Sequence, residues 1–193
     1  MAMVSEVDCR QAISTLLQTW MPWVLAELGR AHPDIAEHLV VPTSDQYREL
    51  HDIAELEKTA PNPPLVAIVC PQTEWTRTGD SLAAAWTVAI NVMTRGWGHD
   101  STVTVNDLYR RAVIDILHNH SDLDGFARDT MVDRSDYRPV ALSSRFLLSG
   151  VVTATVFKSC VVQRHHPLVP PDPPDPVDVP TIATTNVQIE ALE

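Results

Sequence analysis

The chain has 193 residues, 45% of them hydrophobic, which is enough apolar material for one ordinary globular core. Its formal net charge is -11, from 25 acidic and 14 basic residues, so the surface as a whole should repel nucleic acid phosphates, which disfavours DNA wrapping as a function. No stretch approaches the roughly 20 apolar residues that cross a bilayer, and the N-terminus carries acids where a signal peptide carries Lys or Arg, so we expect a soluble, unexported protein.

The first predicted element is an amphipathic helix over residues 6–30. Ser5 or Asp8 can cap its first turn. Pro22 lacks an amide hydrogen and clashes with the preceding turn, so we expect the helix to kink or restart there and to form two pieces. Apolar residues at three- and four-residue steps define the buried stripe, namely Ile13, Leu16, Leu17, Trp20, Val24 and Leu28.

The next predicted elements are two strands. Residues 33–60 have a weaker pattern, and the acidic segment 47–58 fits either a short helix or an edge strand. Three prolines between residues 61 and 64 then end any helix and favour extended geometry, so residues 65–70 are predicted as a buried strand. Polar residues 74–80 follow. A second strand is predicted over residues 84–94, because Trp86, Val88, Ile90 and Val92 alternate onto one face.

A second helix is the clearest element in the sequence. Apolar residues from Val105 to Leu117 keep the helical period, Thr104 with Asp107 makes an approximate capping box, and the helix should end near Asn119. Residues 95–98 before it contain two glycines and are read as a turn, since no phosphate-binding glycine motif accompanies them. Residues 121–125 after it favour turn geometry.

The rest of the core is predicted to be β-rich, with a short strand over residues 131–137 and a long run over residues 144–162 that Gly150 bulges or bends. Antiparallel pairing in chain order, with both helix faces on one side, predicts a two-layer α+β fold: a mainly antiparallel sheet packed by two principal helices. We expect residues 1–166 to form this compact domain.

The composition changes at Pro167. Seven of the fourteen residues 167–180 are proline, and residues 167–193 carry five acids with no Lys or Arg. Such a segment tends to stay extended, so it is predicted to be an acidic C-terminal arm rather than core. We expect the arm to dock on a neighbouring subunit through Val187, Ile189 and Leu192.

No catalytic residue, cofactor site or metal site is predicted, and we expect a protein that is not an enzyme. His118 and His120 lie two residues apart and so do not share a helix face, and the adjacent pair His165 and His166 is an alternative metal ligand set only if subunits bring several copies together. Residues 122–125 resemble the start of a calcium loop but lack its closing glutamate, so a turn is the better interpretation. The cysteines have no metal or disulfide spacing and are read as reduced thiols, namely Cys9, Cys70 and Cys160.

The tryptophans divide into two groups. Trp20 belongs to the helix stripe and Trp86 to a strand face, so both are predicted to pack in the core. Trp75 and Trp97 lie in polar or turn contexts. Large exposed aromatic side chains often anchor interfaces, and Trp97 is therefore the candidate interface residue of the predicted domain.

Residues 8–165 resemble the tail-terminator proteins of long-tailed, siphovirus-type phages, especially those that infect actinobacteria. The resemblance is carried by the N-terminal helix, the strand over residues 65–70, the segment WTVAINV at residues 86–92 with its turn, the helix segment LYRRAV at residues 108–113, and the turn SDLDG at residues 121–125. The long C-terminal extension is not part of this pattern.

The resemblance implies a structural virion protein, assembled in the host cytoplasm and located in the tail or neck. It implies a hexameric ring that caps the tail tube, with the tail tube protein and the head-tail connector protein as partners, and with DNA passing the channel without specific binding. From the net charge we expect acidic side chains to line the channel. The alternatives are another head-tail connector protein, a stopper or adaptor, and a monomeric regulatory domain.

Overall fold

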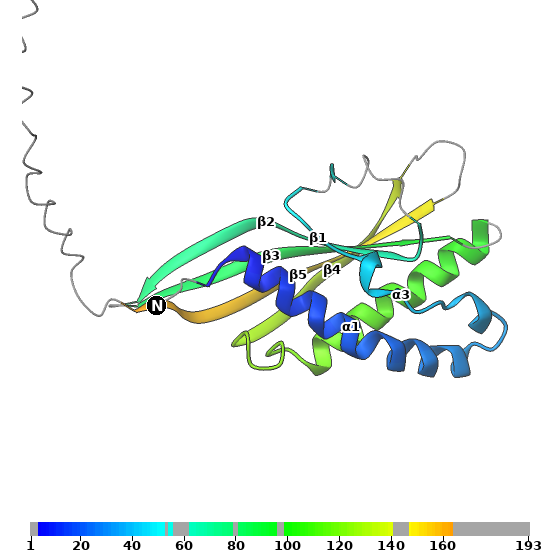
Figure 1. The fold of residues 1–193 in the computed structure, drawn as a ribbon, viewed down its shortest axis with the longest axis horizontal. Helices are drawn as coiled ribbons and strands as arrows, with labels where there is room; N and C mark the ends of the chain where they lie inside the picture. The colour runs from blue at the N-terminus through cyan, green and yellow to red at the C-terminus, as the bar shows by residue number, and fades with distance from the viewer. Residues whose placement is uncertain are drawn as a thin grey trace, which may run out of the picture.

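The computed structural model describes residues 4–52, 54–55, 62–78, 81–95, 99–140 and 147–163. Five strands form one sheet in the order β1-β2-β3-β5-β4, and α1 and α3 lie together on one of its faces (Figure 1). The predicted two-layer α+β fold is confirmed, but the predicted antiparallel pairing in chain order is wrong, because β5 lies between β3 and β4 and β1 is parallel to β2. In chain order the elements are α1 (Glu6–Ala31), the short 3-10 helices η1 (Ala36–His38) and η2 (Ser44–Gln46), β1 (Tyr47–Leu50), β2 (Leu65–Thr78), β3 (Ser81–Thr94), α3 (His99–Asn119), β4 (Asp129–Val140) and β5 (Leu147–Gln163).

Helix α1 begins with the predicted cap. The Ser5 hydroxyl accepts a hydrogen bond from the Asp8 amide at 3.4 Å, and the Asp8 carboxylate accepts one from the Ser5 amide at 2.7 Å. The helix then runs through Pro22 as a single element, so the predicted division into two pieces is wrong. Pro22 itself is exposed, whereas Met21 and Leu25 beside it are buried. Burial of this face against the sheet outweighs the one helical hydrogen bond that proline removes.

The sheet is larger than the sequence indicated. The acidic segment that fitted either a short helix or an edge strand begins as an edge strand. This strand, β1, pairs in parallel with β2, from Tyr47 opposite Val66 to Leu50 opposite Val69. Strand β2 continues to Thr78, far beyond the predicted residues 65–70. The second half of β2 is polar and solvent-exposed, but it pairs with β3. Pairing within this hairpin, rather than burial, therefore makes it a strand.

The core lies between the helices and one face of the sheet. The alternating residues predicted in β3 are fully buried there, and α3 covers them with the apolar face predicted for it, which includes Val105 and Leu117. Helix α3 ends at Asn119 as predicted, and Gly125 in the following turn has a φ of 86°, where glycine is favoured. The predicted capping box is wrong, because α3 begins at His99 and the Thr104 hydroxyl donates to the Asp100 carbonyl within the helix at 3.0 Å.

Gly150 has a role that differs from the predicted bulge. It pairs in regular register with Val92 of β3 and Tyr137 of β4, and the register shifts lie elsewhere in the sheet. A Cβ atom at this position would lie 2.2 Å from both the Asn106 Oδ1 atom and the Arg110 Cδ atom of α3. At Gly150, therefore, the side chains of Asn106 and Arg110 of α3 lie directly against the sheet backbone.

Replacing Gly150 with alanine should lower the free energy of unfolding by about 1–3 kcal/mol, the usual effect of overpacking a core. Urea denaturation measures this change. Gly29→Ala in α1 is the matched control, because its added methyl group would meet Ala36 at an ordinary 3.5 Å and alanine favours the helix. Equal stability of the two variants would contradict the close approach of α3.

Candidate functional site: sheet edges and the open face

The two outer edges of the sheet are the first candidate for an assembly surface. Within the part of the chain that the structure describes, β1 pairs with only the first half of β2, so residues 72–78 have β3 on one side and no strand on the other. At the opposite side, β4 is the last strand of the described sheet, and among the described strands it pairs only with β5. Both edges present backbone amide and carbonyl groups that can pair with another chain. Figure 1 shows the paired ends of β2, β3 and β5 extending beyond α1.

The face of the sheet opposite α1 and α3 is here called the open face. Strand alternation places small residues at its centre, such as Ala85, Thr87 and Thr155, all of them partly buried. Acids outnumber arginines among its described charged side chains. Those acids are Glu74, Asp129, Asp133 and Asp136, and the arginines are Arg48 and Arg134.

Three large apolar side chains are exposed near the open edges, namely Trp75, Met131 and Phe157. Trp75 is 43% exposed and lies on the unpaired half of β2. Its partner across β3 is Ala84, a buried residue of the core, so Trp75 projects from the same face of the sheet as the helices. Trp23, on α1, is 60% exposed and lies on a different element.

A shallow hollow of about 240 Å³ lies beside the other edge, between β4 and the C-terminal half of α3. It combines apolar side chains with one imidazole and one carboxylate. The lining residues are Ile114, His118, Asp129, Thr130, Met131 and Val132.

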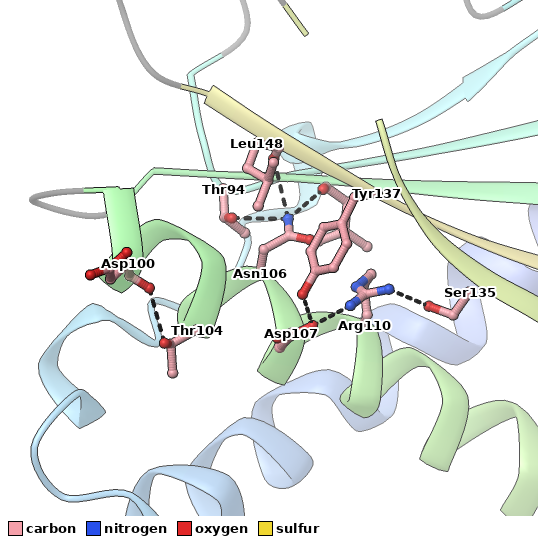
Figure 2. Close-up of polar contacts among 10 residues, drawn as sticks. Thr94, Asp100, Thr104, Asn106, Asp107, Arg110, Ser135, Tyr137 and Leu148 are labelled. Atoms are coloured by element: carbon pink, nitrogen blue, oxygen red, sulfur yellow. Dashed lines mark hydrogen bonds and ion pairs between the residues drawn. The ribbon is translucent and has the colours of Figure 1, made fainter. Parts of the chain in front are cut away.

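A polar cluster fixes α3 across three strands (Figure 2). The Asn106 side chain is fully buried, and its amide lies within donor distance of the Val92 carbonyl at 2.9 Å, the Thr94 hydroxyl at 3.0 Å and the Leu148 carbonyl at 3.2 Å. Asn106 thereby bridges β3 and β5. Its Oδ1 atom has no hydrogen-bond donor and lies close to Gly150, where a Cβ atom would collide with it.

The second half of this cluster joins α3 to β4. Arg110 donates to the Ser135 hydroxyl at 2.7 Å and to the Asp107 carboxylate, which also accepts a hydrogen bond from Tyr137. The Arg110 guanidinium lies 3.9 Å from the centre of the Tyr137 ring. These groups largely satisfy one another, so the arrangement orients α3 and contains no nucleophile paired with a base.

The described cysteines are buried and free, as predicted for reduced thiols. Cys9 of α1 and Cys70 of β2 interact through their side chains beside the buried Arg10. Donation from the Cys9 thiol lowers the pKa of Cys70, and the same interaction together with burial raises the pKa of Cys9. Nothing is described of the Cys160 side chain.

His118 and His120 lie in different surroundings. His118 lines the hollow, whereas His120 packs against the Trp20 ring at 4.4 Å and contacts Asp124 at 3.4 Å. Among the described residues, no three His, Cys, Asp or Glu side chains are grouped so as to hold a metal ion. No described helix is long and apolar enough to cross a membrane.

The predicted interface residues Trp97, Val187, Ile189 and Leu192 all lie outside the described residues, as does the proline-rich arm. Sequence reasoning did not select the unpaired edges or Trp75. The available signal was the high content of threonine and tryptophan in residues 73–78, which favours a strand despite the polarity of the segment. No protein-family model matches the chain, and no curated protein matches it with significance.

The three tyrosines of the chain predict a loss of stability at alkaline pH. Burial raises the pKa of Tyr47, Tyr109 and Tyr137 above the usual value near 10, and donation to the Asp107 carboxylate contributes at Tyr137. Because the pKa values are raised by folding, the stabilisation is complete below about pH 10 and is lost as the pH rises through the raised values.

Phenolate absorbance and far-ultraviolet circular dichroism, followed together during an alkaline titration, should therefore show tyrosine ionisation delayed beyond pH 10 and accompanied by unfolding. Asp107→Asn removes the acceptor carboxylate and should lower the pKa of Tyr137. Ionisation of all three tyrosines near pH 10 in a folded protein would contradict the burial described here.

Proposed function

We propose that this protein is a ring-forming structural subunit of a phage particle, the terminator that caps the tail tube and joins it to the head-tail connector. The observation that carries the proposal is the pair of unpaired edges at opposite sides of one sheet. A contact between two different edges is head-to-tail, and a head-to-tail contact closes into a ring when the rotation between copies divides a full turn. The resemblance to tail terminators supplies the expected number of six copies.

The open face is the surface that we assign to the channel of this ring. The helices cover the opposite face, so in a ring of edge-paired sheets they would form its outer layer. The open face has alanine and threonine at its centre, and its described acids outnumber its described arginines. Electrostatic repulsion of phosphates acts over roughly 8 Å at physiological salt, so DNA would pass without adhering.

The proposed role needs no chemistry, and we assign no catalytic residue, cofactor or metal to the protein. The polar groups around Asn106 and Arg110 are engaged in holding α3 to the sheet. The proposed partners are other copies of the chain, the tail tube protein and the connector protein. The proposed location is the tail or neck of the virion.

Native mass spectrometry of purified protein, and copy counting in isolated tails, test the ring. We expect six copies at the end of each tail that meets the head. A free monomer before assembly is compatible with this expectation, because the tube can supply the template. A single copy in the assembled tail would refute the ring. Six or more copies located between connector and head would instead indicate a stopper or adaptor protein.

A further inference from the structure

Two features described above lie at opposite edges of the sheet and have matching shapes. Trp75 is a large side chain that projects from the unpaired half of β2 with 43% of its surface exposed. The hollow beside β4 is a concave surface lined by both apolar and polar side chains. Within the described part of the chain, Trp75 cannot fill the hollow of its own copy, because β3 and β5 lie between β2 and β4.

Trp75 and the α3 wall of the hollow lie on the helix side of the sheet, and the hollow reaches around the β4 edge to Asp129 and Met131. Trp75 pairs with Ala84, and Ala84 belongs to the core beneath the helices. At the other edge, Thr130 and Val132 pair with Val156 and Ala154, which belong to the same core. The hollow also includes Ile114 and His118 of α3. A sheet continued from one copy to the next would therefore bring Trp75 to the side on which the hollow opens.

The two features also lie at nearly the same height along the strands. Reading across the sheet, Thr73 of β2 pairs with Trp86, which pairs with Val156, which pairs with Thr130 of β4. Trp75 is two residues from Thr73 along the same strand. Copies related by rotation alone keep this height, apart from the stagger that strand tilt introduces. Three successive antiparallel pairings also make β2 and β4 run in opposite directions, as antiparallel pairing between copies requires.

The size and chemistry of the hollow suit an indole ring. An apolar cavity of roughly 150 Å³ holds benzene, and the hollow is about 240 Å³. Ile114 and Val132 offer apolar contacts, and the Asp129 carboxylate offers an acceptor for the indole N–H. Tryptophan in a well-fitted pocket is among the side chains that contribute most to interface affinity.

We propose that Trp75 of one copy inserts into the hollow between α3 and β4 of the next copy, beside a β-sheet that continues from residues 72–78 of the first copy to β4 of the second. This proposal rests on the proposed ring and identifies its subunit contact. The partner is a second copy of this chain, bound head-to-tail.

Trp75→Ala tests the contact, with Trp23→Ala as the matched control, because Trp23 is exposed on α1 and has no part in the proposed interface. Thermal unfolding should be unchanged for both, since both side chains are exposed. Native mass spectrometry across a dilution series, or incorporation into tails, should show that Trp75→Ala weakens assembly by about tenfold or more, as expected for a central aromatic anchor. Trp23→Ala should assemble like the parent protein.

A cross-linking experiment tests the direction of the contact in a Cys160→Ser background. Trp75→Cys and His118→Cys chains should form a disulfide-linked heterodimer when mixed under mild oxidation, whereas each chain alone should remain unlinked. If the parent forms a ring and Trp75→Ala assembles equally well, the contact is wrong and the ring stands. If the parent is a single copy in assembled tails, the proposed function fails and this contact fails with it. Cross-links within one variant alone would overturn the head-to-tail arrangement.

Discussion

At Gly150 helix α3 comes so close to the sheet that one added methyl group would collide with Asn106 and Arg110. This approach lets the buried Asn106 amide reach β3 and β5, and lets Arg110 reach β4. The polar groups thereby set the position and direction of α3, while the apolar face of the helix covers Trp86 and its neighbours. Both described helices lie on one face, and the only apolar cluster described on the open face is the small buried one of Leu65, Ala67 and Met93 near Leu50.

Unpaired edges are usually short or protected, since they promote uncontrolled association. Here residues 72–78 of β2, which have no described strand on their outer side, carry polar residues such as Gln72 and Glu74 but keep the exposed Trp75 among them. The polar residues oppose indiscriminate pairing, and the tryptophan favours a partner with a matching hollow. A subunit that assembles only with its own kind and in one direction needs this combination. An acidic open face is compatible with a DNA channel but does not by itself require one.

The sequence predicts those elements in which the buried residues recur at one regular spacing. The alternation of β3 and the apolar face of α3 are of this kind, and both fill the core as expected. It did not predict the course of α1 through Pro22, because tertiary packing there outweighs a local preference. Nor did it predict the role of Gly150, which depends on a residue of α3 distant in the chain. The sequence places Trp75 in a polar context, but its position at a sheet edge is known only once its strand is seen to have no described outer neighbour.

Hydrogen-deuterium exchange, compared between free protein and assembled tails or rings, tests the central claim most directly. If the sheet continues from copy to copy, assembly should slow exchange at residues 72–78 of β2 and at the outer amides of β4, while core amides of β3 change little. Protection confined to the helices, with both edges exchanging as fast as in the free protein, would contradict an edge-paired ring.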